Sequence, residues 1–212
     1  MAVDLVKLLK NRTEEQQRVI KYFHDADKGC FSKGMTDQEY DQLVMKKVSS
    51  IDHKQRALDK LGIDIDQVTE VEPVHFENWL FDSGRTYAKL GEDNNWRSSA
   101  YQVTWIFFSA DQIYLYQYTF NMDEDGKKEQ TEEYFYRDIT NFSSSSESIE
   151  KEDVLINTSC NGNKEYGRRM IETNVFKIVV PGDKLECAVK KNDYTESAIQ
   201  GMKAKLREKK NA

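Results

Sequence analysis

Large apolar side chains alternate with polar or smaller ones over two neighbouring stretches in the middle of the chain, 101–109 and 113–121. This period of two is typical of β-strands, whose successive side chains point to opposite faces of a sheet. The polar break at 109–112 and the pair Asp125-Gly126 further on are typical of turns. A third strand is therefore expected at about 127–137, which makes a β-meander. The residues expected to share a face within the first two strands are Tyr101, Val103, Trp105 and Phe107, and then Tyr114, Tyr116, Tyr118 and Phe120.

The second of these strands also carries large apolar side chains on its other face, at Ile113 and Leu115. A sheet with large apolar side chains on both faces has to be covered on both faces. We therefore expect other parts of the chain to pack against each side of this hairpin, at least near its turn.

The first 62 residues follow a helical pattern instead, with apolar residues three and four positions apart. Thr13 with Gln16, and Thr36 with Glu39, have the spacing of a capping box at the start of a helix. Gly62 suits the left-handed position that ends one. Helices this short are unstable alone in water. They are expected to pack on each other, on the rest of the chain, or on a second copy.

The remaining sequence predicts further strands. One is expected from Val74 to Phe81, and the long polar connection that follows, 82–100, is expected to contain a short strand at 86–90. The serine run 143–146 predicts a flexible loop. Three strands are then expected near 152–160, 170–180 and 183–189, the last two joined by a tight turn at Pro181-Gly182-Asp183.

A helix is expected to close the chain, with Asp193 and Glu196 as its cap. Its apolar residues recur at helical spacing, so that one face is buried and the other is exposed. The residues on the buried face are expected to be Thr195, Ile199, Met202 and Leu206.

Residues 73–210 resemble a bacterial pleckstrin-homology-like (PH-like) domain. The resemblance is carried by YFYRDITNF at 134–142, by VFKIVV at 175–180, and by the closing helix with Ile199 and Met202 facing inward. It implies two nearly orthogonal sheets that form an open barrel, with the last helix plugging one end. A lipocalin- or cystatin-type sandwich is the rival, although a lipocalin needs eight longer strands in a closed barrel.

The expected fold class is therefore α+β, in two parts. An N-terminal helical segment, residues 1–66, precedes a PH-like antiparallel β-barrel or sandwich of about seven strands, residues 67–212, which is capped by the C-terminal helix.

The composition of the chain argues against several classes of function and of site. The net charge of −6 speaks against nucleic-acid binding, which needs clustered Lys and Arg. Three well-separated cysteines, Cys30, Cys160 and Cys187, indicate reduced core thiols rather than a disulfide framework or a zinc site. The N-terminus has neither a signal peptide nor a spanning segment, so a cytoplasmic protein is expected.

The sequence contains no catalytic or cofactor motif: no phosphate-binding loop, no GxGxxG, no GxSxG and no HExxH. Structural or surface roles are favoured for His24, His53 and His75, because the sequence places no catalytic partner beside them. Asp123, Asp125 and Gly126 lack the spacing of a calcium loop and indicate a hairpin turn. We therefore expect no enzyme, no cofactor and no metal.

The candidate binding residues are Arg85, Lys89 and Arg97, in the polar connection after the first strand. The PH-like resemblance implies that this connection corresponds to the loop with which lipid-binding PH domains hold inositol phosphates. Here the closely spaced Lys/Arg signature is missing, and nearby carboxylates such as Asp93 offset the charge. The sequence thus favours contact with a protein partner or self-association, with binding to anionic lipid headgroups as the alternative.

Overall fold

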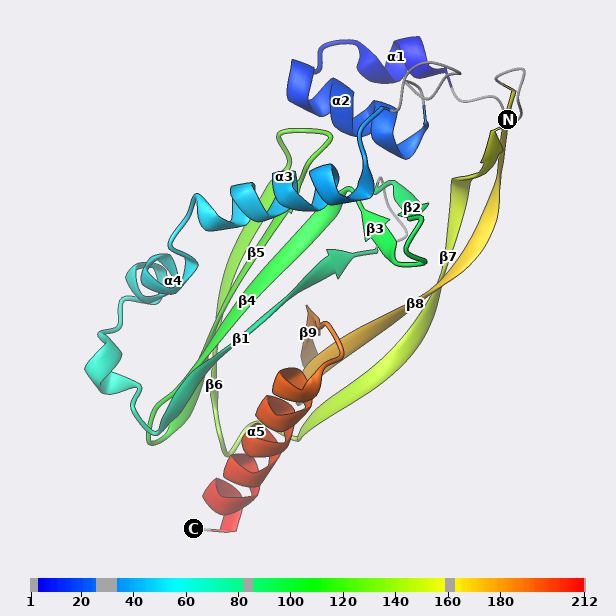
Figure 1. Ribbon diagram of the computed structural model, residues 1–212. Helices are drawn as coiled ribbons and strands as arrows, with labels where there is room; N and C mark the ends of the chain where they lie inside the picture. Colours follow the sequence, from blue (N-terminus) through cyan, green and yellow to red (C-terminus); the bar gives the residue numbers. More distant parts are fainter. Residues whose placement is uncertain (1–3, 26–33, 82–85, 159–162, 212) are drawn as a thin grey trace.

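The computed structural model describes residues 4–25, 34–81, 86–158 and 163–211. Its helices and strands form three layers: helices, a four-stranded sheet, and a second sheet with the closing helix beside it (Figure 1). The described strands are nine. The short strand predicted at 86–90 is present as β2, Ala88–Leu90, and it pairs with a strand that the sequence does not predict, β3, Trp96–Ser98.

The first layer consists of α1 (Leu5–Leu9), α2 (Glu14–Phe23), α3 (Asp37–Ser49) and α4 (His53–Leu61), followed by a short 3-10 turn, Ile65–Gln67. Both predicted capping boxes are present, at the first residues of α2 and α3. Gly62 ends α4 with a φ of 67°, the left-handed conformation expected of a glycine there. The predicted starts of α2 and α3 and the predicted end of α4 are therefore confirmed.

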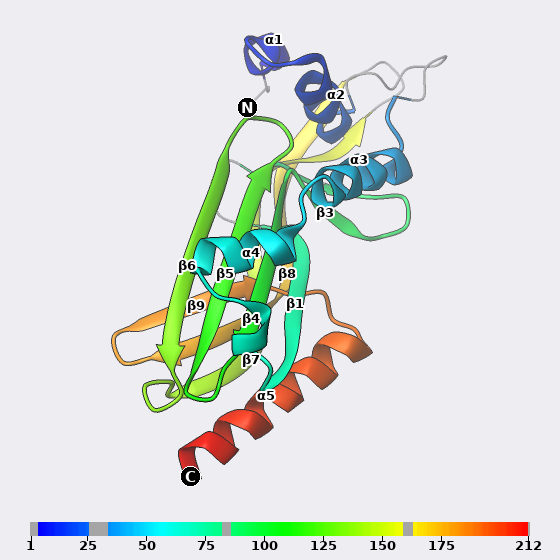
Figure 2. The ribbon, with the colours of Figure 1, turned by 90° about the vertical axis from the view of Figure 1, so that its left-hand side faces the viewer.

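The second layer is an antiparallel sheet of β1 (Val71–Leu80), β4 (Ala100–Phe108), β5 (Gln112–Asn121) and β6 (Lys127–Phe135), in the order β1-β4-β5-β6. The predicted meander is confirmed as β4, β5 and β6. In its register Tyr101 lies opposite Phe120, and Phe107 opposite Tyr114. Figure 2 shows α4 lying across one face of this sheet, with β9 crossing behind the other.

The third layer is a sheet of β7 (Asn141–Thr158), β8 (Lys164–Val180) and β9 (Asp183–Ala188). The serine run at 143–146 is not the loop that the sequence predicts, because it forms the first part of β7. Ser144 pairs with Phe176 of β8, and Phe142 is fully buried just before the run. Pairing with an apolar neighbouring strand thus outweighs the weak local preference of serine for turns.

The closing helix, α5 (Asp193–Asn211), buries the four predicted residues of its apolar face. Its cap differs from the prediction. The Asn192 side chain accepts a hydrogen bond from the Thr195 backbone N–H at 2.8 Å, the usual geometry of an Asn cap. The first residue of the helix, Asp193, comes one position too late for that role.

Each face of the central hairpin belongs to a different core. Odd-numbered residues of β4, such as Val103 and Phe107, pack against α2, α3 and α4. Ile106 and Phe108 pack instead against β8, β9 and α5. The helical segment therefore shares a core with the β part. The predicted boundary at 66/67 falls within the 3-10 turn Ile65–Gln67 and stays a prediction.

Two buried glutamines connect the central sheet to the edge of β9. The Gln102 side-chain oxygen accepts from the Ala188 N–H at 2.7 Å, and the Gln117 amide donates to the Glu186 carbonyl at 2.9 Å. These bonds satisfy backbone groups on β9 that a continuous barrel would pair with another strand. Among the described residues the sheets stay separate, so the arrangement is a sandwich and no closed barrel is found.

Truncating either core should destabilise the protein, but in different places. Phe107→Ala and Phe108→Ala should each cost about 3–5 kcal/mol in denaturant unfolding, because both side chains are fully buried. Native-state hydrogen exchange should speed up mainly in α2–α4 for Phe107→Ala and in β8–α5 for Phe108→Ala. Phe135→Ala, at a side chain 45 % exposed, is the control and should change stability little. Equal exchange changes in both layers would contradict the two-core arrangement.

A charged pair holds α4 on the sheet. The Arg56 guanidinium donates to both carboxylate oxygens of Glu129, at 2.6 and 2.9 Å, and these bonds lower the pKa of Glu129 to about 2. A lowered carboxyl pKa adds stability that is present above the unfolded-state value of about 4.3 and lost as pH falls through the folded value.

Arg56→Met should therefore lower the unfolding free energy at pH 7 by about 1 kcal/mol, the scale of a well-formed but partly exposed pair. Its deficit relative to wild type should be constant above about pH 4.5 and should close as pH falls towards about 2. Urea titrations at several pH values measure this. A deficit independent of pH would show that Arg56 acts through packing alone.

Candidate functional site

Two of the three predicted binding residues, Lys89 and Arg97, lie opposite each other on β2 and β3, and Arg85 lies outside the described residues. Lys89 is 8 % exposed. Its ammonium bonds the Asp25 carboxylate at 2.6 Å and the Tyr22 carbonyl at 2.8 Å, and it lies over the Tyr22 ring. The charge of Lys89 is therefore used to hold the end of α2 against β2.

Arg97 is still more enclosed, at 4 % exposed. Two of its nitrogens donate to the two Asp41 oxygens at 2.7 Å each, and its other face donates to Asp93 at 2.9 and 3.0 Å. These hydrogen bonds hold the pKa of Asp93 well below its usual range. One guanidinium thus ties α3 to the β2–β3 turn through paired, charge-assisted bonds.

We call this group of five side chains the clamp. It consists of the two cations, Lys89 and Arg97, and the carboxylates that they bind, Asp25, Asp41 and Asp93. Asp37 joins it by accepting from the Tyr22 hydroxyl at 2.6 Å. Burial and this bond raise the pKa of Tyr22 well above its usual value. The structure brings two predicted binding residues together, but it points them at the chain's own carboxylates. The geometry favours a structural role for both, and anion binding by them stays a prediction without support.

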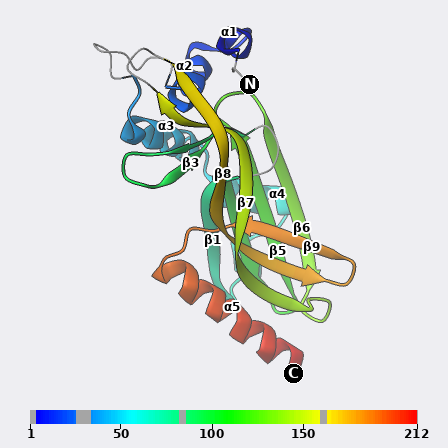
Figure 3. The same cartoon turned by 90° about the vertical axis from the view of Figure 1, so that its right-hand side faces the viewer.

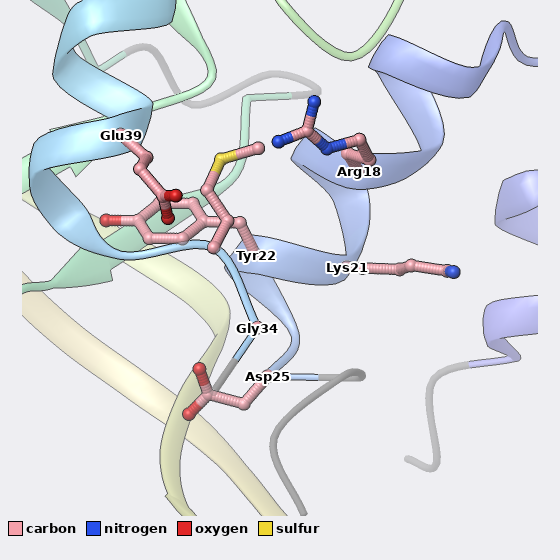
Figure 4. Close-up of a pocket in the computed structure, with 7 residues that line it drawn as sticks. Arg18, Lys21, Tyr22, Asp25, Gly34 and Glu39 are labelled. Atoms are coloured by element: carbon pink, nitrogen blue, oxygen red, sulfur yellow. The ribbon is translucent and has the colours of Figure 1, made fainter. Parts of the chain in front are cut away.

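A small cavity of about 150 Å³ lies beside the clamp, between α2 and the start of α3 (Figure 4). Its wall includes Tyr22, Asp25 and Glu39, and the last of these is already used by the capping box of α3. Ligand sites usually have about 300 Å³ or more. This cavity is therefore too small to be the main candidate.

A larger groove of about 520 Å³ runs between the serine part of β7 and the first half of α5. Figure 3 shows α5 passing the end of the β7–β8 hairpin where β7 begins. Val175, Val189 and Ile199 supply apolar walls, and hydroxyl and amide groups supply the rest. The polar residues that line it are Ser144, Ser145, Ser146, Asn174, Lys191, Thr195, Glu196, Ser197 and Gln200.

The groove is bounded by a strand edge. β7 is the outermost strand of its sheet, since β8 pairs with it on one side only. An edge strand presents a row of backbone N–H and C=O groups to which another strand can add. The groove therefore combines apolar walls and hydroxyl groups beside an edge strand.

The sequence analysis missed this site because it predicted a loop at 143–146. One signal could have revealed it: residues 141–158 contain no Gly and no Pro, and loops of that length are seldom without both.

Comparisons with family models, with curated proteins and with solved structures found no match to this chain. Among the described helices none is long and apolar enough to cross a membrane.

Removing the central cation of the clamp should be costly. Arg97→Leu leaves Asp41 and Asp93 close together without their partner, so the unfolding free energy should fall by about 3 kcal/mol. Arg137→Leu, at a side chain 79 % exposed, is the matched control and should stay within about 0.5 kcal/mol of wild type. Chemical denaturation of both variants measures the difference. A mild effect of Arg97→Leu would mean that the clamp is dispensable.

Proposed function

We propose that this chain is a non-enzymatic binding protein that holds an extended segment of a partner protein in the groove between β7 and α5. One observation carries the proposal: a groove of about 520 Å³ is lined by α5 and by residues of β7, which is an edge strand of its sheet. Partners that add to a sheet edge gain affinity from main-chain hydrogen bonds and specificity from pockets for alternate side chains.

The order of elements supports placing this groove on a PH-like scaffold. A four-stranded sheet is followed along the chain by a three-stranded sheet and a closing helix, apart from the small β2–β3 insertion. That is the order implied by the resemblance of residues 73–210. The groove lies where an edge of the second sheet meets the closing helix.

The walls of the groove indicate the chemistry of the partner segment. Side chains directed at Val175, Val189 and Ile199 have to be small and apolar. The serines of β7 offer hydroxyl groups that both donate and accept, so they suit an uncharged backbone. The partner is therefore an extended, mostly uncharged segment with small apolar residues at every second position.

The alternative, binding to anionic lipid headgroups, has less support. It depends on Arg85, Lys89, Arg97 and the lysines of the C-terminal helix, and Lys89 and Arg97 are buried against carboxylates. Flotation with anionic and neutral liposomes separates the two functions. If the chain binds a partner protein and not lipid headgroups, we expect no salt-sensitive binding to anionic vesicles.

Selection from a displayed library of random peptides tests the proposal directly. Wild type should enrich uncharged sequences with alternating small apolar residues. Gln200→Trp places an indole in the groove from an exposed position on α5. It should weaken the binding of the selected peptides by about tenfold or more. Glu133→Trp, at an exposed position on β6, is the matched control and should bind as wild type.

Nuclear magnetic resonance should then place the largest peptide-induced shifts at residues 143–147 and on the first half of α5. If no sequence is enriched, or if selected peptides bind the Gln200→Trp protein unchanged, the groove is not the binding site.

A further inference from the structure

A second large cavity, of about 590 Å³, lies at the other half of β7. It forms where the end of α2, the strand β2, the β5–β6 turn and the middle of β7 meet. Its volume is in the range of small-molecule sites. The residues that line it are Leu8, Arg12, Phe23, His24, Thr86, Tyr87, Ala88, Asp123, Glu124, Glu150, Lys151, Glu152 and Asp153.

Two buried polar atoms in this lining have no hydrogen-bond partner in the protein. They are Nε2 of His24 and Oδ1 of Asp123, on side chains only 3 % and 4 % exposed. A buried polar group without a partner costs about 1–3 kcal/mol. Folded proteins leave few such groups, and each calls for an explanation.

The neighbours of His24 fix which nitrogen is left over. Its Nδ1 lies 3.1 Å from the Tyr166 hydroxyl oxygen, and its ring packs edge-on against Tyr87. Burial, followed by the nearby Lys164, lowers the pKa of His24 to about 4, so the imidazole is neutral at pH 7. In the tautomer that carries the proton on Nδ1 and donates it to Tyr166, Nε2 is a free acceptor, and an N–H donor in the cavity selects this tautomer.

Asp123 is held by the turn between β5 and β6, whose backbone is fixed by the bond from the Met122 N–H to the Ser99 carbonyl at 2.8 Å. The nearest lining guanidinium, Arg12, pairs with Glu124 at 3.3 Å. Oδ1 of Asp123 therefore remains a second unused acceptor. Burial raises the pKa of the Asp123 carboxyl because it disfavours the charged form, and a cation beside Oδ1 would offset this cost.

The lining of the cavity carries more negative than positive side chains, which suits a ligand that donates hydrogen bonds to these two acceptors. Five carboxylates line the cavity against two cations, Arg12 and Lys151. Beyond them the lining offers apolar surface at Leu8, Phe23 and Ala88. A ligand that fits has to be positively charged, rich in N–H donors and partly apolar.

We propose that this cavity binds a small organic amine, whose N–H groups donate to Oδ1 of Asp123 and to Nε2 of His24. Its alkyl part lies on the apolar side chains. A second positive end is attracted by Asp153, because Glu150 and Glu152 are paired with Arg168 at 3.6 and 2.8 Å. Among the described residues no three His, Cys, Asp or Glu side chains converge on one point as a metal requires. Acceptors spread around a cavity suit an organic cation with several N–H groups better.

Calorimetry with cadaverine, a five-carbon diamine, tests the proposal, and the uncharged pentanediol of the same length is the ligand control. Wild type should bind cadaverine saturably and should not bind pentanediol. Asp123→Asn keeps the shape and removes the charge, and His24→Gln removes the ring acceptor. Each should weaken cadaverine binding by about tenfold or more. Asp111→Asn, in the exposed β4–β5 turn, should bind as wild type.

A second measurement on wild type needs no variant. Titration with cadaverine should shift the imidazole nitrogen resonances of His24 and should leave those of the more distant His75 unchanged. Circular dichroism establishes that each variant is folded. If wild type shows no saturation up to roughly 10 mM, well above the ~1 mM of a weak site, or if the His24 resonances do not respond, the proposal is wrong.

Discussion

Burial of both faces of the β4–β5 hairpin is the constraint on which the rest of the molecule depends. Phe107 and Phe108 are neighbours in sequence and both are fully buried, yet they belong to different cores. A strand sends successive side chains to opposite faces, so one layer cannot cover both. The helical segment and the second sheet with α5 are therefore required by the same two strands, and neither is an optional addition.

Buried polar groups then determine how the covering layers are placed. Apolar contact is non-directional, whereas a hydrogen bond fixes position and angle. Gln102 and Gln117 set β9 across the central sheet, and Arg97 sets α3 against the β2–β3 turn. Displacing either layer would leave a buried donor or acceptor without its hydrogen-bond partner. This explains how short helices, unstable alone, take up one defined arrangement.

The parts that the sequence predicts are those decided by local pattern. Alternation gives the meander, the capping boxes give the helix starts, and the spacing of Thr195 to Leu206 gives the buried face of α5. What it misses depends on partners far along the chain. Ser143 to Ser146 become a strand because β8 lies beside them. Lys89 and Arg97 look like a basic site until the fold brings Asp25 and Asp41 to them.

The two halves of β7 differ in the number of charged residues that they carry. An exposed strand edge invites pairing with any other chain, and proteins protect such edges with charged residues and bulges. From Glu147 to Asp153 the strand carries five charged residues, and a register shift between Lys151 and Val154 accompanies the left-handed Asp153. Residues 141–146 carry no charge. The uncharged half lines the groove beside α5, while the charged half lines the acidic cavity. The charges and the register shift protect the second half of the edge from pairing with another chain.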